Sequence, residues 1–268
     1  MTTQSEPAVL FEVTDCVGWI TLNRPKAYNA LNTDLAGRLL DAVIRCDEDD
    51  DVRALVITGK GSSFCSGGDI KQMMDAVASD GHAGAFLKTL TVSLHETIAT
   101  MAHMSKPVIT AVNGAAAGAG FSLALAGDLV LAAENARFTV AYTAIGLAPD
   151  GSSTFTLPRL IGPKRAFELM CTNRALSANE AKELGLVNQV LPTAQFIEHA
   201  RKFATNVAKG PTAALGCAKK LLTLSAQNSL ESQMEHERRA IAACGRTADF
   251  REGADAFFAK RPAKFQGR

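Results

Sequence analysis

The segment Lys106–Asp128, which reads KPVITAVNGAAAGAGFSLALAGD, limits the possible folds of this chain more than any other. It starts as an apolar strand, continues through small residues and ends as an apolar helix. Between Asn113 and Gly120 every residue is glycine or alanine. A ligand could therefore approach the main chain there, and the free N–H groups at the start of the next helix could bind negative charge.

Two other interpretations of this glycine-rich segment stay open. One is a tight strand-to-helix turn without a ligand, since a glycine motif alone does not establish binding. The other is a dinucleotide-binding loop, but Gly118–Gly120 is followed by Phe121–Leu123. The third glycine of the dinucleotide fingerprint is therefore missing, which argues against that loop.

A strand, a small-residue turn and a helix occur in the same order more than once. The pattern covers Arg53–Ala78 and again Pro107–Ala126. An earlier strand and helix are expected at Val17–Leu22 and Thr33–Cys46. A repeat of this kind favours an α/β fold built from stacked strand–helix units.

From about Thr193 onward the chain is predicted to be helical. Earlier in the chain, the apolar stripe of Phe86–Met104 predicts an amphipathic helix. Ser177–Glu180 has the pattern of a capping box, and Gly185 is expected to end the helix that it opens. We divide the chain into a core, residues 1–192, and a C-terminal helical region, residues 193–268, which would serve association or cover the core.

The composition argues against several classes of partner. The 268 residues carry a formal net charge of +1, which does not favour a nucleic-acid or membrane surface as the main partner. The six cysteines form no C-x-x-C pair, and the N-terminus has neither a basic start nor an apolar core, so we expect a cytoplasmic protein. The five histidines show no ligand spacing, so we expect no metal site.

Six motifs are spread in order over nearly the whole chain. They are ITLNRPKAYNAL (Ile20–Leu31), FCSGGDI (Phe64–Ile70), KPVITAVNGAAAGAG (Lys106–Gly120), GLAPDGSSTFTLPRLIG (Gly146–Gly162), LSANEAKELGLVNQV (Leu176–Val190) and FFAKRPAKF (Phe257–Phe265). Each motif is weak alone, and their ordered set is specific. With these motifs the chain closely resembles the crotonase superfamily of enoyl-CoA hydratases and isomerases.

The resemblance implies a fold and a substrate. The fold is an α/β spiral of repeated strand–strand–helix units with a C-terminal helical region for trimerisation. The substrate is an acyl-CoA thioester, so coenzyme A belongs to the substrate and no separate cofactor is expected. By the same resemblance the protein is a homotrimer or a dimer of trimers.

The resemblance also implies an oxyanion hole. Two backbone N–H groups of the family bind the thioester oxygen, and the matching positions are Gly68 and Ala119. An enolate or a tetrahedral oxyanion is charged, so fixed N–H donors aimed at it stabilise it by several kcal/mol. This agrees with the free amides inferred above from the small residues.

Further residues match the parts of the family that contact coenzyme A. One segment lies along the pantetheine and the phosphates, and one turn holds the adenine. A C-terminal pair often reaches the nucleotide of a neighbouring subunit. The matching residues are Lys26 and Ala27 for the segment, Ser66, Asp69 and Ile70 for the turn, and Phe257 and Lys260 for the pair.

The chain departs from the hydratase pattern at two positions. Typical enoyl-CoA hydratases deliver water with two glutamates, and the aligned residues are Ser122 and Tyr142. Neither can act as a carboxylate base. Asp150 matches the catalytic aspartate of several isomerases and aryl-CoA dehalogenases, so we expect it to move a proton between carbons of a bound enolate. Ser122 and Tyr142 would then shape the acyl pocket, and Tyr142 could donate a hydrogen bond.

His95 matches the histidine base of 4-chlorobenzoyl-CoA dehalogenase, although a histidine beside an apolar helical stripe is more often structural. Isomerisation of a double bond is thus expected rather than hydration. One alternative is a dehalogenase-like or hydrolytic reaction in which Asp150 is the nucleophile and His95 activates water. Another is a protein that binds coenzyme A and catalyses nothing.

Overall fold

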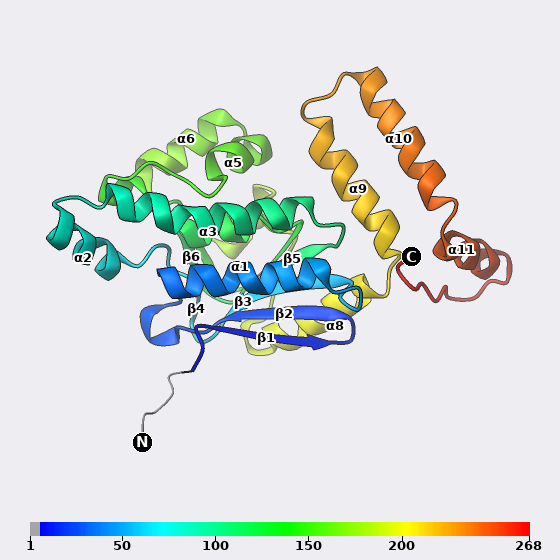
Figure 1. Ribbon diagram of the computed structural model, residues 1–268, viewed down its shortest axis with the longest axis horizontal. Coiled ribbons are helices and arrows are strands. Elements are labelled where there is room, and N and C mark those ends of the chain that lie inside the picture. The colour runs from blue at the N-terminus through cyan, green and yellow to red at the C-terminus, as the bar shows by residue number, and fades with distance from the viewer. Residues whose placement is uncertain (1–5) are drawn as a thin grey trace.

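A six-stranded sheet runs through the centre of the molecule in the computed structural model, which describes residues 6–268 (Figure 1). Only β1 is antiparallel, as the outer strand of a hairpin with β2, and the other neighbours are parallel. The order is β1 (Val9–Thr14), β2 (Val17–Leu22), β3 (Ala54–Gly59), β5 (Val108–Val112), β7 (Leu129–Ala133) and β10 (Gln189–Leu191).

A second sheet of short strands lies next to the first. Its order is β4 (Ser63–Cys65), β6 (Ala115–Ala117), β8 (Arg137–Thr139) and β9 (Leu176–Ser177). Each of β4, β6 and β8 follows a long strand of the first sheet, so the chain alternates between the two sheets. This is the expected strand–strand–helix repeat, and the predicted fold class is confirmed.

The glycine-rich segment differs in one respect from the sequence-based expectation. The residues Ala115–Ala117 form strand β6 rather than part of a turn, and they pair with β8. Small residues allow this because the neighbouring main chain is very close. A Cβ at Gly114 would lie 2.0 Å from the carbonyl oxygen of Ser62.

Helices cover both faces of the larger sheet, as is usual for parallel strands. On one face α1 (Thr33–Glu48) packs against α3 (Gly84–His103), and the side chains of Leu55 and Ile57 point into this layer. On the other face α8 (Phe196–Ala208) covers the alternate strand residues, such as Val56. The predicted strands and long helices of the core are therefore confirmed.

The remaining core helices follow the short strands. They are α2 (Ile70–Asp80), α4 (Ala119–Leu125), α5 (Ser153–Ile161), α6 (Pro163–Thr172) and α7 (Ala178–Glu183), with single 3₁₀ turns at Pro25–Ala27 (η1), Thr143–Ile145 (η2) and Thr193–Gln195 (η3). Helix α4 begins at Ala119, earlier than expected, and the capping box between Ser177 and Glu180 is confirmed.

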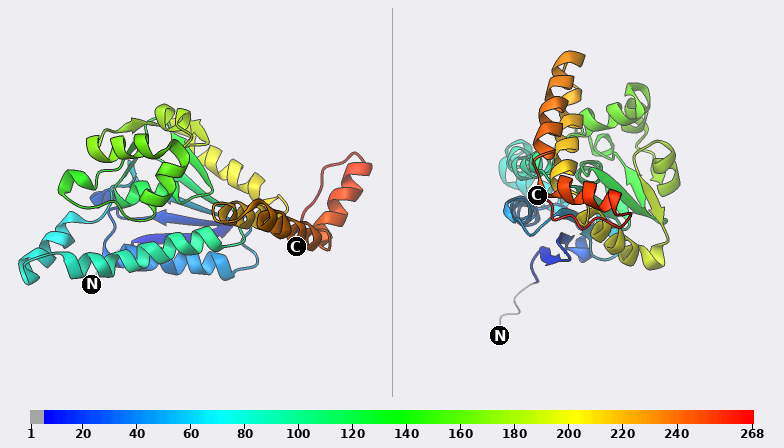
Figure 2. Two further views of the ribbon diagram at one scale, coloured as in Figure 1. Left: turned by 90° about the horizontal axis from the view of Figure 1, so that it is seen from above. Right: turned by 90° about the vertical axis from the view of Figure 1, so that its right-hand side faces the viewer.

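Three helices project from one end of the sheets, opposite the end that carries α2 (Figures 1 and 2). They are α9 (Thr212–Ser225), α10 (Leu230–Cys244) and α11 (Ala248–Phe258). Lys219 ties α9 to the core, since its Nζ lies 2.7 Å from Asp128 Oδ2 and 2.5 Å from the carbonyl oxygen of Met101. Across residues 6–268, every helix is too short or too polar to cross a bilayer.

Candidate active site

A cavity of about 330 Å³ lies where the two glycine-rich segments face helix α3. Its walls are mostly apolar, and three leucines of α3, Leu87, Leu90 and Leu94, form one of them. Asp150 is the only carboxylate among the residues that line the cavity. A cavity with apolar walls and few polar groups is the usual form of a small-molecule site.

Two glycine-rich turns form one side of this cavity, which we call the amide side: Gly67 and Gly68 from one turn, Gly118 and Ala119 from the other. The turns touch main chain to main chain. A Cβ at Gly67, where φ is +103°, would lie 3.0 Å from the carbonyl oxygen of Ala117. Glycine serves both the left-handed conformation and the close approach.

The neighbouring helix residue is even more restricted. A Cβ at Gly120 would lie 2.0 Å from the carbonyl oxygen of Cys65. Strand β4 therefore presses directly on the first turn of α4. Burial raises the pKa of the Cys65 thiol to about 12, so this cysteine is not a nucleophile at neutral pH.

The N–H groups of Gly68 and Ala119 are left without a protein acceptor among the hydrogen bonds of residues 6–268. The carbonyl group before Gly68 and the N–H group after it are both bonded to Leu31. Leu31 N–H donates to the carbonyl oxygen of Gly67 at 2.7 Å, and Asp69 N–H donates to Leu31 at 2.9 Å. Ala119 is the first residue of α4, where N–H groups have no intrahelical partner. The predicted pair of free amides thus lies on one cavity wall.

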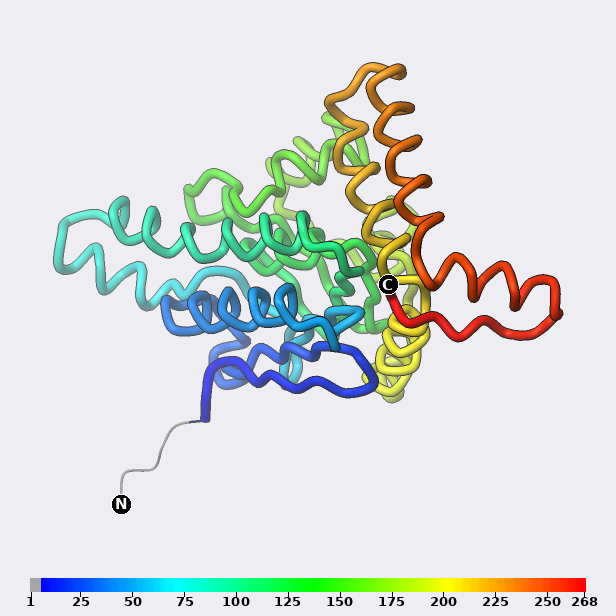
Figure 3. Tube along the Cα trace, turned by 45° about the vertical axis from the view of Figure 1, so that its right-hand side comes forward, coloured from blue at the N-terminus to red at the C-terminus, as the bar shows by residue number. Residues whose placement is uncertain are grey.

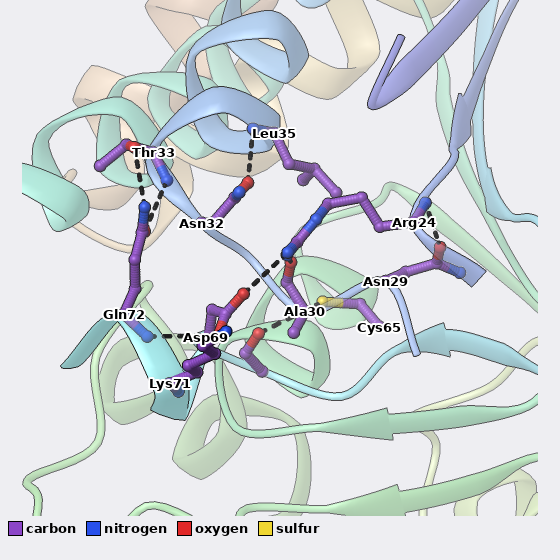
Figure 4. A network of polar contacts seen from close by, with 11 residues as sticks. Arg24, Asn29, Ala30, Asn32, Thr33, Leu35, Cys65, Asp69, Lys71 and Gln72 are labelled. Atoms are coloured by element: carbon purple, nitrogen blue, oxygen red, sulfur yellow. Dashed lines mark hydrogen bonds and ion pairs between the residues drawn. The ribbon is translucent and has the colours of Figure 1, made fainter. Parts of the chain in front are cut away.

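A polar network fixes the turn that carries Gly68 (Figure 4). Asp69 caps α2, because its Oδ1 accepts from the N–H of Lys71 at 3.1 Å. Its Oδ2 lies 2.8 Å from Arg24 Nη2, and Arg24 Nη1 donates to the carbonyl oxygen of Ala30 at 2.5 Å. Sequence reasoning assigned Asp69 to the adenine turn and gave Arg24 no role. In the structure, the side chains of both residues hold the turn in place.

Asp150 and its neighbours form a second part of the site, which we call the acid side: His95, Ser122, Tyr142 and Asp150. The Oδ1 atom of Asp150 is buried and has no hydrogen-bond partner. Its Oδ2 atom lies 3.4 Å from Nε2 of His95, whose side chain is 53% exposed. Buried polar atoms are nearly always paired, so an unpaired carboxylate oxygen points to a functional role.

The two hydroxyl groups of the acid side bond to each other. Ser122 Oγ lies 2.9 Å from the hydroxyl of Tyr142, and it donates to the main-chain carbonyl of Asp150 at 2.9 Å. Burial, followed by the nearby charge of Asp150, raises the pKa of Tyr142. Tyr142 lines the cavity, whereas Ser122 is fully buried behind it.

The structure brings only some of the predicted coenzyme A contacts to the cavity. Ser66 and Ile70 line it, while Lys26 and Ala27 lie in the nearby 3₁₀ turn η1. Helix α11 lies away from the core of the molecule (Figure 3). Phe257, 79% exposed, lies in the last turn of this helix, and Lys260 follows the helix. These two residues do not reach the cavity of their own chain, and their expected contact with a neighbouring subunit stays a prediction.

The leucines of α3 include both core residues and residues of the cavity wall, which the sequence alone did not distinguish. Their helical spacing predicted a face that packs on the core, which is correct for Ile98 and Met101. Leu87 and Leu94 also line the cavity. Hydrophobic periodicity identifies the buried face of a helix, but it does not distinguish a core contact from the wall of a binding site.

The chain matches the enoyl-CoA hydratase/isomerase family model over residues 12–268. It is 37% identical over 260 residues to the 1,2-epoxyphenylacetyl-CoA isomerase of Escherichia coli, with 97% of this chain and 98% of the relative covered. A protein of Rhodobacter capsulatus named as a probable enoyl-CoA hydratase is 40% identical over 262 residues, with the same coverage. A 4-chlorobenzoyl coenzyme A dehalogenase of an Arthrobacter species is 36% identical over 269 residues, which cover 100% of this chain and 94% of the relative.

The structure is likewise similar to solved ones. The crystal structure of an enoyl-CoA hydratase/isomerase from Cupriavidus metallidurans superposes with a TM-score of 0.88 at 35% sequence identity. The superposition covers 98% of both chains. The names of these relatives include hydration, isomerisation and dehalogenation, so similarity alone does not select one reaction.

Proposed function

The chain belongs to the enoyl-CoA hydratase/isomerase family, and we propose that it moves a double bond within an enoyl-CoA thioester rather than adding water to it. It is an enzyme of the crotonase superfamily, and a CoA thioester substrate is consistent with that family. Asp150 would be the acid–base group, and Gly68 and Ala119 would form the oxyanion hole.

The proposed reaction begins with Asp150 in its ionised form. Oδ1 removes a proton from a carbon that is activated by the thioester, and the electron pair moves onto the thioester oxygen as an enolate. The N–H groups of Gly68 and Ala119 stabilise that oxygen, since both are free and both residues line the same cavity as Asp150. The protonated Asp150 then returns the proton to the other end of the allylic system, and no water is consumed.

One observation carries the choice of isomerisation: among residues 6–268, Asp150 is the only carboxylate that lines the cavity. Addition of water by the two-glutamate mechanism needs a second carboxylate. At the two positions concerned the chain has Ser122 and Tyr142, whose hydroxyls are bonded to each other. A single carboxylate is sufficient to carry one proton from one carbon to another.

Incubation with 2-enoyl-, 3-enoyl-, dienoyl- and aryl-CoA thioesters in deuterated water tests the proposal. We expect deuterium at the α or γ carbon of an enoyl-CoA, and we expect Asp150→Asn to lower its incorporation about 10³-fold. Fast addition of water that persists in Asp150→Asn would contradict the proposal.

A second reaction is favoured by one contact, the 3.4 Å between His95 Nε2 and Asp150 Oδ2. In a dehalogenase-like reaction, Asp150 would attack the halide-bearing carbon of an aryl ring and expel the halide; in a hydrolytic reaction, it would attack the thioester carbonyl and expel the CoA thiolate. Water activated by His95 would then hydrolyse the bond between the substrate and Asp150. Mass spectrometry of the intact protein separates the two mechanisms. An adduct on Asp150 that accumulates in His95→Gln supports the nucleophilic reaction, and proton transfer leaves the protein mass unchanged.

We also propose that residues Lys26, Ala27, Ser66, Asp69, Ile70, Phe257 and Lys260 contact coenzyme A, the last two in a neighbouring subunit. The projecting helices favour association, because Leu222, Ile241 and Phe258 are large apolar side chains that are mostly exposed. The expected assembly is a homotrimer or a dimer of trimers. Light scattering after size-exclusion chromatography would test it, and a monomeric mass would contradict it.

A further inference from the structure

The main-chain carbonyl oxygen of Asp150 is the most heavily bonded acceptor near the cavity. Ser122 Oγ donates to it at 2.9 Å, Ser153 Oγ at 2.9 Å and Ser153 N–H at 3.2 Å. The hydroxyl of Tyr142 lies 3.4 Å from the same oxygen. The Oδ1 atom of the same residue has no partner at all. The fold thus fixes the peptide of Asp150 and leaves one carboxylate oxygen unpaired.

The two hydroxyl protons can be assigned from the distances. Ser122 has one proton, and its shortest contact with an oxygen that can only accept is the 2.9 Å to Asp150. The proton of Tyr142 is then directed to Ser122 Oγ, also at 2.9 Å. The reverse assignment would use the longer 3.4 Å contact from Tyr142 to Asp150. In the favoured arrangement Tyr142 has no free proton to give to a substrate.

Packing also restricts the turn that carries Asp150, in addition to the hydrogen bonds. Gly151 follows with φ at +58°, and a Cβ there would lie 2.9 Å from Cβ of Ser122. The same Cβ would lie 3.4 Å from side-chain atoms of Leu94 and Ile98. The turn therefore rests directly on Ser122 and on α3. Any movement of Ser122 shifts the peptide beside Asp150.

We propose that Ser122 and Tyr142 form a hydroxyl relay that positions Asp150, with Tyr142 donating to Ser122 and Ser122 donating to the Asp150 carbonyl. This inference rests on the proposed function, because it assigns the relay to the residue that moves the proton. Both relay residues act through Asp150. Tyr142 is not a second acid or base, although it lines the cavity.

The test is a double-mutant cycle on deuterium exchange into a 3-enoyl-CoA, in which Tyr142→Phe and Ser122→Ala are made in the native protein and in Asp150→Asn. In the native background we expect each change to lower kcat by about tenfold with KM nearly unchanged, because a misplaced catalytic group costs rate rather than binding. In Asp150→Asn the same changes should have no further effect on exchange, since groups that act as one unit are not additive.

A matched control is Thr58→Val, which removes a buried hydroxyl that donates to the carbonyl of Ala111 at 2.8 Å, away from Asp150. It should leave kcat unchanged. If Tyr142→Phe lowers the exchange rate by the same factor in the native protein and in Asp150→Asn, Tyr142 acts independently of Asp150. That result would overturn the relay. No loss in the native background would overturn it as well. If Asp150→Asn itself keeps full exchange, the proposed function fails first.

Discussion

The amide side of the cavity is formed by main-chain groups, whereas the acid side is formed by side chains. The amide side consists of main-chain N–H groups, whose directions are set by contacts such as Gly120 against Cys65 and Leu31 against Gly67. The acid side consists of side chains, and its central atom, Asp150 Oδ1, has no partner. The amide side can stabilise a developing negative charge, whereas the acid side determines which proton is moved.

The difference predicts how each side responds to substitution. A change of a cavity-lining side chain on the acid side should alter the reaction and leave the fold intact, because one side chain replaces another in a cavity. A change at Gly120, which follows the amide side in the chain, should affect the fold as well, since a Cβ there would lie 2.0 Å from the carbonyl oxygen of Cys65. The following substitutions test this contrast.

Asp150→Asn should have the largest effect on rate. The amide cannot accept the substrate proton, so deuterium exchange should fall about 10³-fold, within the range for loss of a general base. Isothermal titration with the thioester should show nearly unchanged affinity, because the amide side is intact. A parallel loss of affinity would show that the two sides are not separable.

Ala119→Pro removes one N–H group from the amide side. Proline is tolerated at the first position of a helix, which is the position of Ala119 in α4. Exchange should fall about 10²-fold, as after loss of one oxyanion-hole donor. Leu230→Pro is the matched control, since Leu230 is the exposed first residue of α10. A similar fall in both variants would indicate a general effect of proline.

Gly120→Ala should destabilise the fold. The added Cβ would lie 2.0 Å from the carbonyl oxygen of Cys65, so strand and helix must separate at a cost of about 2 kcal/mol. Gly37→Ala, within α1, meets no atom within 4 Å and should gain about 0.5 to 1 kcal/mol. Urea unfolding of both variants measures the contrast. Equal stabilities would contradict the close contact.

Asp69→Asn should have a smaller effect on stability. Asparagine caps a helix as well as aspartate, so the change chiefly removes the ion pair with Arg24, which is partly buried. We expect a loss of about 1 kcal/mol, together with a few-fold lower rate because the Gly68 turn loosens. Arg24→Gln should give the same loss, and the double variant should show little more.

The burial of Tyr142 should lower the stability of the folded protein at alkaline pH. Its pKa is raised in the folded protein by burial, whereas the unfolded chain ionises near the ordinary value of about 10. This contribution to stability is complete below that value and declines as the pH rises above it. Between about pH 9 and about pH 10.5 the native protein should lose about 0.8 kcal/mol relative to Tyr142→Phe. The free energy of unfolding of both proteins is measured across this pH range. The same pH dependence for the native protein and Tyr142→Phe would contradict the prediction.

The amide side was largely predictable from the sequence. A run of glycine and alanine between a strand and a helix has few physical explanations, and the free amide of Ala119 follows from its place at a helix start. Strand β6 within that run was missed, because its pairing with Arg137–Thr139 depends on a segment about twenty residues away. Local pattern does not reveal such a partner.

The acid side was less accessible. Asp150 before a glycine looks like an ordinary turn residue, and only the resemblance pointed to it. The contact between Ser122 and Tyr142, 20 residues apart, and that between Arg24 and Asp69, 45 apart, arise from the packing of different units. Neither leaves a periodic signal, so the coordinates were needed to find them.

The close approach of Gly120 to Cys65 has a consequence for evolutionary change in this chain. Any side chain added at Gly120 clashes with the carbonyl of Cys65, so substitutions at this position should seldom be tolerated. The side chain of Tyr142 borders a cavity and can be exchanged with little effect on the backbone. New reactions should therefore arise in descendants of this protein through substitutions at cavity-lining positions such as Tyr142, while Gly120 is inherited unaltered.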